Sequence, residues 1–269
     1  MSAYKIEAGT GQHIGDRAEQ QDRIALFGAP RAPGYMMAIL ADGMGGARGG
    51  SIAAEQAIRT AQQVFESFSP ITDDVEAMLH QIASEIHTVI RLMTLSTQIR
   101  PQTTLALLVL TPERSAIWGH VGDSRIYRFS GPNLVQRTSD DHGAALSTSA
   151  GHGGSAGQPA APSDPFAAHN LIGKAGKPPV LAIGRHADLK AGDAFVLCSD
   201  GLWKHCQDGE LGAAVAMHAP RDAAQMLIRK VRERVTDGTG DNCSLGVVKL
   251  SAPPKQVLDF KVEKMRRAV

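Results

Sequence analysis

The chain is predicted to be an α+β protein in which two antiparallel β-sheets pack face to face, with helices outside them. Short apolar or β-branched runs, bounded by turn residues, recur along the 269 residues and are typical of strands. Two long helical patterns interrupt these runs as a pair, without the regular strand-helix alternation of a parallel sheet. The sequence contains no internal repeat.

Seven segments are predicted strands because each is short, apolar or β-branched, and bounded by turn residues. Several are apolar throughout, which indicates strands covered on both faces. The segments are Ile24–Phe27, Tyr35–Leu40, Thr104–Leu110, Ser115–Val121, Arg125–Phe129, Ala194–Cys198 and Cys243–Leu250.

Helices are predicted over residues 51–68 and 73–95, where apolar residues recur at helical spacing. Pro70 separates the two, so we expect an antiparallel helix hairpin between strands, and Thr72 or Asp73 can cap its second helix. A further helix is expected from Pro220 to Val235. A weaker pattern covers Asp208 to His218.

Residues 1–252 are expected to form a single domain, because its acidic motifs are spread over the whole length and must meet. Residues 143–168 are rich in Ala, Gly, Ser and Pro, so we expect either a featureless linker or a flexible flap beside an active site. Residues 253–269 form a C-terminal tail of mixed charge, which is either a last helix or a frayed end.

The balance of 28 Lys and Arg against 27 Asp and Glu gives a net charge of +1, which favours neither nucleic acid nor an anionic membrane as a partner. The three cysteines form no CxxC pair and favour a reducing compartment, with Cys198 and Cys243 as small core residues. No apolar segment has the length of a signal peptide or membrane span. We therefore expect a cytoplasmic protein, and a monomer, although the sequence leaves the oligomeric state open.

Four acidic motifs lie beside predicted strands, where folding can gather their carboxylates. Oxygen ligands with negative charge are what a hard divalent cation requires. Each motif alone also fits a turn: a Gly-rich turn after Asp42, a tight hairpin at Asp123, a turn at Asp200 and an Asx turn at Asp241. Arg17 offers a fork of donors for phosphate oxygens, or else a surface salt bridge.

These motifs, taken in order, resemble those of the protein phosphatase 2C family, the metal-dependent serine/threonine phosphatases, and especially its compact bacterial members. The resemblance covers Arg17 to Asn242, nearly the whole chain. Its motifs are Arg17-Ala18-Glu19-Gln20-Gln21-Asp22, Asp42-Gly43-Met44-Gly45-Gly46, Thr103-Thr104, His120-Val121-Gly122-Asp123-Ser124-Arg125, Asp141-His142, Cys198-Ser199-Asp200-Gly201-Leu202-Trp203 and Asp241-Asn242.

The resemblance implies a four-layer α-β-β-α sandwich and a centre of two Mn²⁺ or Mg²⁺ ions, with a third ion in many bacterial members. It implies that an activated water attacks the phosphorus of phosphoserine or phosphothreonine in a protein substrate, opposing a bacterial serine/threonine kinase. By this resemblance Asp42 bridges the two ions, and Asp200 and Asp241 complete the site of the first ion. The Gly43 carbonyl binds the second ion, and Asp22 holds the water ligands of that ion. Asp123 helps bind the third ion, and Arg17 binds the substrate phosphate.

Three departures from the family pattern bear on these expectations. Gln21 stands where the family usually has Glu, which predicts weaker binding of the second metal ion. Met44 replaces the His of eukaryotic members, so water or another residue must protonate the leaving group. The segment from His169 to Gly176 follows the family only loosely. The alternatives are therefore a pseudophosphatase that binds a partner without turnover, or a hydrolase of small phosphate esters.

Overall fold

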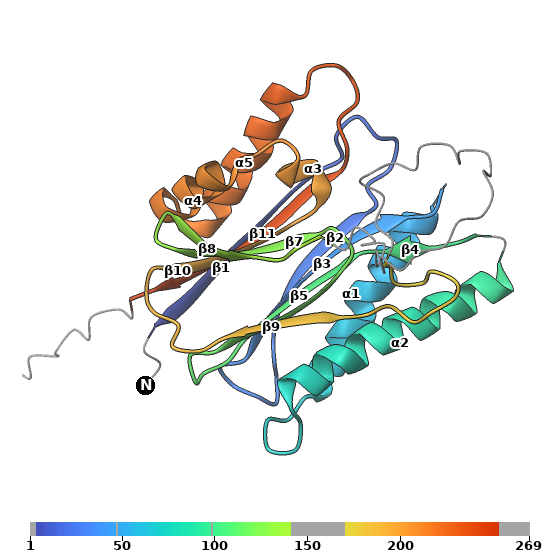
Figure 1. The fold of residues 1–269 in the computed structure, drawn as a ribbon, viewed down its shortest axis with the longest axis horizontal. Helices are drawn as coiled ribbons and strands as arrows, with labels where there is room; N and C mark the ends of the chain where they lie inside the picture. The colour runs from blue at the N-terminus through green and yellow to red at the C-terminus, as the bar shows by residue number, and fades with distance from the viewer. Residues whose placement is uncertain (1–3, 47, 98, 141–169, 253–269) are drawn as a thin grey trace, which may run out of the picture.

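The protein is described by a computed structural model that places residues 4–46, 48–97, 99–140 and 170–252 (Figure 1). Two β-sheets pack against each other, and helices cover the outer face of each. The α+β sandwich of two antiparallel sheets expected from the sequence is thus confirmed. The loop over 143–168 and the tail over 253–269 lie outside the described residues.

The first sheet has six strands, in the order β2-β3-β5-β6-β9, with the short β4 paired to β3. All of its pairs along this order are antiparallel. Its strands are β2 (Asp22–Gly28), β3 (Met36–Met44), β4 (Gln102–Thr103), β5 (Leu105–Leu110), β6 (Ala116–Val121) and β9 (Ala182–His186).

The second sheet has five strands, in the antiparallel order β1-β11-β10-β7-β8. Both β5 and β10 are buried along their whole length, as expected for apolar strands that are covered on both faces. The strands are β1 (Lys5–His13), β7 (Arg125–Ser130), β8 (Asn133–Arg137), β10 (Asp193–Cys198) and β11 (Cys243–Ser251).

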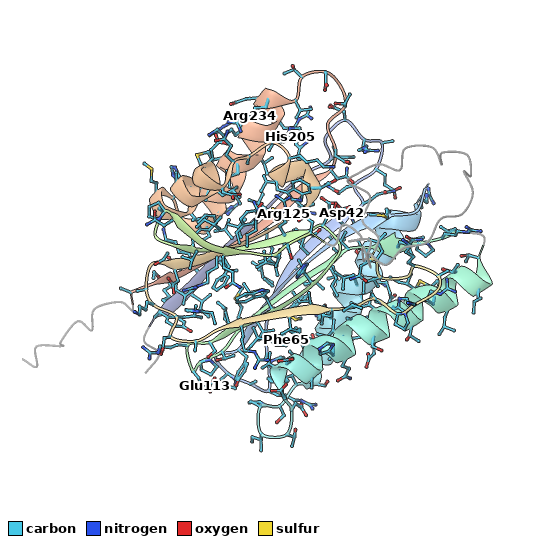
Figure 2. The ribbon with its side chains drawn as sticks, in the orientation of Figure 1. Asp42, Phe65, Glu113, Arg125, His205 and Arg234 are labelled. Carbon is cyan, nitrogen blue, oxygen red and sulfur yellow. The ribbon has the colours of Figure 1, made fainter. Side chains whose placement is uncertain are left out.

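Helices α1 (Gly49–Ser67) and α2 (Val75–Ser96) pack on each other and on the six-stranded sheet. Helices α3 (Asp200–Trp203), α4 (Asp208–Met217) and α5 (Pro220–Arg234) cover the five-stranded sheet. Three apolar layers result: one between the sheets and one beneath each group of helices. Phe65 of α1, which is fully buried, belongs to the layer under α1 and α2 (Figure 2).

Each of the seven predicted strands and four predicted helices is present, with bounds shifted by a few residues. The predicted cap of α2 was wrong by one position: its N-cap is Asp74, whose carboxylate accepts a hydrogen bond from the Ala77 amide at 2.9 Å. Thr72 and Asp73 instead belong to the turn before the helix, where both amides donate to the Ser69 carbonyl. Cys198 and Cys243 are buried in the core, as predicted.

None of the helices in the described ranges combines the length and the apolar character that a bilayer crossing demands.

Candidate functional site

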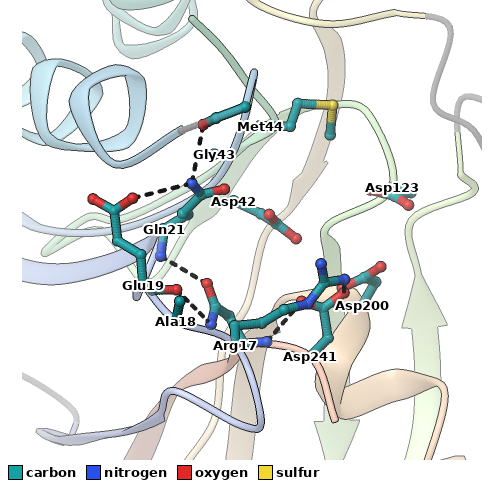
Figure 3. Close-up of a pocket in the computed structure, with 12 residues that line it drawn as sticks. Arg17, Ala18, Glu19, Gln21, Asp42, Gly43, Met44, Asp123, Asp200 and Asp241 are labelled. Carbon is teal, nitrogen blue, oxygen red and sulfur yellow. Dashed lines mark hydrogen bonds and ion pairs between the residues drawn. The ribbon is translucent and has the colours of Figure 1, made fainter. Parts of the chain in front are cut away.

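The four acidic motifs meet in one pocket of about 540 Å³, formed at the ends of strands from both sheets (Figure 3). Asp42 comes from β3 of the six-stranded sheet, whereas Asp200 follows β10 and Asp241 precedes β11 of the five-stranded sheet. The pocket is lined by Arg17, Ala18, Glu19, Gln21, Asp42, Gly43, Met44, Gly46, Asp123, Asp200, Asp241 and Asn242.

Strand register brings a second carboxylate next to Asp42, behind the pocket. Asp22 of β2 lies directly opposite Asp42 of β3, a cross-strand pairing that is unfavourable for like charges. Burial, followed by the charges of Asp22, Asp200, Asp123 and Asp241, raises the pKa of Asp42 well above its ordinary value. Such a group is stabilised in its ionised form only if positive charge is placed beside it.

Asp22 is itself buried behind the pocket and does not line it. Its Oδ2 accepts a hydrogen bond from the Ser199 hydroxyl at 2.8 Å, while its Oδ1 has no hydrogen-bond partner among the described residues. Burial raises the pKa of Asp22 to about 6, although the hydrogen bond from Ser199 acts to lower it. An unsatisfied buried carboxylate oxygen is costly, so this atom is well suited to accept from a polar ligand.

The backbone around Asp42 is held rigidly by the following strands. The Asp42 amide donates to the Thr104 hydroxyl at 3.0 Å, and the Asp42 carbonyl accepts from the Thr103 hydroxyl at 3.0 Å. Gly43 then passes so close to the start of α1 that an added Cβ would lie 2.0 Å from the Gly50 carbonyl oxygen. Only glycine fits at this position, and Gly43 is one of the residues that line the pocket.

Asp123 lies where the chain crosses from β6 in one sheet to β7 in the other. The hairpin turn considered for Asp123 is therefore ruled out. Its carboxyl group is buried, and burial followed by the charge of Asp200 raises its pKa to about 6. The Trp203 indole donates to the Asp123 carbonyl oxygen at 3.0 Å, and the Arg125 guanidinium stacks 3.6 Å from the centre of the same indole ring.

Two of the acidic side chains are paired with cations. Lys204 Nζ lies 2.7 Å from Asp200 Oδ2, and Arg17 Nη2 lies 2.8 Å from Asp241 Oδ2. Burial alone would lower the pKa of Lys204, but the hydrogen bond to Asp200 and the charges of Asp200, Asp123 and Asp241 raise it overall. The surface salt bridge considered for Arg17 is thus present in the structure, with an acid of the pocket as its partner.

The segment that carries Arg17 and Gln21 is hydrogen-bonded to Asn242, just before β11. The Asn242 side chain accepts from the Gln21 amide at 2.7 Å and donates to the Ile14 and Glu19 carbonyl oxygens. Gln21 Nε2 lies 3.4 Å from both Glu19 Oε2 and the Gly46 carbonyl oxygen. The side-chain amide of Gln21 therefore faces the glycine-rich turn after β3.

Over the described residues, no three His, Cys, Asp or Glu side chains adopt the spacing of a metal centre. The donor set nevertheless suits a hard divalent cation, because the candidate ligands are all oxygen atoms. Burial, followed by repulsion from the neighbouring carboxylates, raises the pKa of Asp42, and the buried Asp22 Oδ1 has no hydrogen-bond partner among the described residues. Both features favour added positive charge, so the residues present fit Mn²⁺ or Mg²⁺.

The structure brings six of the seven candidate residues to the pocket wall and leaves Asp22 behind it. The sequence analysis did not identify the ion pair between Lys204 and Asp200. This pair can be recognised only once the chain from Asp200 is known to be helical. The sequence analysis also missed Ser199, whose hydroxyl binds Asp22. His120 of the same motif as Asp123 is buried, with Nε2 2.9 Å from the Ser139 carbonyl oxygen, a contact that fits a structural role; His142 lies outside the described residues.

The chain is similar to known proteins over most of its length. The chain is 28% identical over 231 residues to the protein phosphatase PhpP of Streptococcus pneumoniae, covering 81% of this chain and 87% of that protein. Its fold is similar to that of a Streptococcus agalactiae serine/threonine phosphatase, with a TM-score of 0.74 and 24% identity over 91% of this chain and 99% of that one. It is also similar to the catalytic domain of the phosphatase PstP in complex with two manganese ions, with a TM-score of 0.70 and 21% identity over 91% and 98% of the two chains. The family described as protein phosphatase 2C matches residues 9–227, and the chain therefore belongs to the protein phosphatase 2C family.

Proposed function

We propose that the protein is a metal-dependent phosphoprotein phosphatase that hydrolyses phosphoserine and phosphothreonine. The observation that carries the proposal is the pocket at the strand ends of the two sheets, in which Asp42 lies with Asp123, Asp200 and Asp241 while Asp22 stands behind it. Concentrated buried carboxylates destabilise a fold unless cations neutralise them. Membership of the family and the two manganese ions of the PstP structure support the same reading.

Mn²⁺ or Mg²⁺ would be held by Asp42, the Gly43 carbonyl, Asp200 and Asp241, with Asp22 behind them and Asp123 beside a third ion. When bound, such ions supply an activated water as the nucleophile. Asp42 and its neighbours hold the centre in place because their backbone is fixed by Thr103 and Thr104. No Cys or Ser nucleophile is required, in keeping with the burial of all three cysteines.

Arg17 is proposed to bind the substrate phosphate. Its side chain is 60% exposed at the mouth of the pocket, and its present partner Asp241 would be taken up by a metal ion. A guanidinium freed in this way can present two parallel donors to phosphate oxygens. Met44 lines the pocket but carries no titratable proton, so we assign protonation of the leaving group to water.

The direct test is hydrolysis of p-nitrophenyl phosphate with Mn²⁺, compared between the native protein and Asp42→Asn. Asp188→Asn is the matched control, since it makes the same chemical change at an exposed residue. We expect Mn²⁺-dependent turnover in the native protein and the control, and its loss in Asp42→Asn. A panel of phosphoserine, phosphothreonine and phosphotyrosine peptides then tests the substrate class, and preference for phosphotyrosine or for small esters alone would contradict the proposal.

The second candidate is a binding module of the same fold without turnover. It is favoured by the pairing of Asp200 with Lys204 and of Asp241 with Arg17, which occupies both acids. The same assay separates the two functions: the module would bind a phosphopeptide without releasing phosphate. We favour the enzyme, opposing a serine/threonine kinase in the cytoplasm as a monomer.

A further inference from the structure

We propose that Lys204 is a resident counter-charge of the acidic pocket, which competes with the divalent cation for Asp200 and so lowers the metal affinity of this chain. The inference rests on the proposed metal centre. It assigns a role to a side chain that belongs to none of the acidic motifs.

The geometry of α3 sets up the competition. Helix α3 begins at Asp200, and the Lys204 amide donates to the Asp200 carbonyl at 3.0 Å, so the two residues stand one helical turn apart. The side chain then curls back to place Nζ 2.7 Å from Asp200 Oδ2. Nζ also lies 5.6 Å from the centre of the Trp203 ring, within the range of a cation–π contact.

The acidic member of the pair is partly sheltered from water, whereas Lys204 is exposed. The side chain of Asp200 is only 17% exposed and that of Lys204 is 39% exposed. An ion pair with one partly buried member is less screened than an exposed one, for which the net gain is small. The ammonium charge is also felt by Asp123 and Asp241 across the pocket, so it neutralises part of the whole cluster.

Metal binding opposes this arrangement. Lys204 occupies one acceptor site of Asp200 Oδ2, so a divalent cation that takes Asp200 as a ligand either displaces the ammonium group or binds the carboxylate beside it. In both cases the ammonium is tethered to α3 and stays close to the incoming ion, where like charges repel. Both effects act in the same direction, and a neutral side chain at this position should therefore bind the metal more tightly.

The chain offers a closely matched control in Lys230 on α5. Its Nζ lies 2.6 Å from Glu210 Oε1, and the side-chain exposures of 39% and 21% are close to those of the Lys204 pair. Glu210 also binds Arg234, so removing Lys230 does not leave that carboxylate unpaired. Lys230→Met thus removes one ammonium charge from the same protein without touching the pocket.

The experiment is calorimetric titration of Mn²⁺ into the metal-free protein, with the Mn²⁺ paramagnetic resonance signal as a second measure of free ion. Lys204→Met should bind Mn²⁺ about tenfold more tightly than the native protein, which corresponds to about 1.4 kcal/mol. Lys204→Gln, a second neutral variant, should shift the same way. Lys204→Arg keeps the positive charge, so its Mn²⁺ affinity should lie within about twofold of the native value. The same is expected of Lys230→Met.

Unchanged or weaker Mn²⁺ binding in both neutral variants, with native binding intact, would overturn the role of Lys204 and leave the proposed phosphatase standing. A native protein that binds no Mn²⁺ would instead overturn the proposed function, and this inference with it. Thermal unfolding in EDTA gives an independent reading. Without metal, Lys204→Met should have a lower melting temperature than the native protein. Saturating Mn²⁺ should raise the melting temperature of Lys204→Met by more than that of the native protein.

Discussion

The buried carboxyl group of Asp123 makes the metal-free protein less stable at neutral pH than it would be with a neutral side chain. Burial, followed by the charge of Asp200, raises the pKa of Asp123 from 3.8 to about 6. Above pH 6 the folded chain must keep this carboxylate ionised in a poorly solvated place, whereas the unfolded chain ionises it freely in water. Replacing Asp123 by asparagine removes that penalty.

The size of the effect follows from the shift of about two pKa units. At about 1.4 kcal/mol per unit, the penalty is about 3 kcal/mol at pH 8, falls to about half of that at pH 5, and vanishes below pH 3.8, where both states are protonated. Because the folded pKa is raised, the destabilisation grows as the pH rises from about 4 to 6. Asp123→Asn should therefore gain stability over the native chain most strongly at high pH.

Urea unfolding in EDTA at pH 5 and pH 8 measures this difference directly. Asp188→Asn is the control, because Asp188 is exposed and has φ 60°, a conformation that asparagine also adopts. We expect the control to stay within about 0.5 kcal/mol of the native protein at both pH values. If Asp123→Asn gave no increase in the free energy of unfolding at pH 8, or the same increase at both pH values, the assignment of a destabilising buried carboxylate would be refuted.

Three further predictions concern the same region and the core. Gly43→Ala should lower stability by about 1–3 kcal/mol, because its Cβ would lie 2.0 Å from the Gly50 carbonyl oxygen; an unchanged melting temperature would contradict that packing. Gln21→Glu should tighten Mn²⁺ binding by adding a negative charge beside Glu19, and calorimetry that shows unchanged affinity would refute this. All three cysteines are buried, so Ellman's reagent should modify none in the native state and three in guanidinium; rapid reaction of the native protein would show an exposed thiol.

Burial explains which strands could be predicted. The fully buried strands β5 and β10 are continuous apolar runs, and both were found from sequence. The whole of β8 is exposed, and β1 has a single buried residue, so neither carries a hydrophobic pattern. Their place in the sheet comes from backbone pairing with β7 and β11, which no local signal reports.

The candidate site divides in a similar way. Acidic residues next to apolar strands are visible in the sequence, and Asp42, Asp200 and Asp241 indeed share one pocket. At Asp123, however, a hairpin and a crossing between sheets have the same local sequence, and only the partners of β6 and β7 distinguish them. The ion pair of Lys204 likewise depends on a four-residue helix that is too short to carry a periodic pattern.

The position of the pocket at the seam of two sheets has a consequence for assembly of the native state. Asp42 belongs to one sheet, while Asp200 and Asp241 flank strands of the other, so neither sheet alone can offer a complete set of carboxylates. A cation that bridges these carboxylates therefore stabilises only chains in which the two sheets have already packed in the correct alignment. Uptake of such an ion can therefore serve as a readout of how the two sheets come together during refolding.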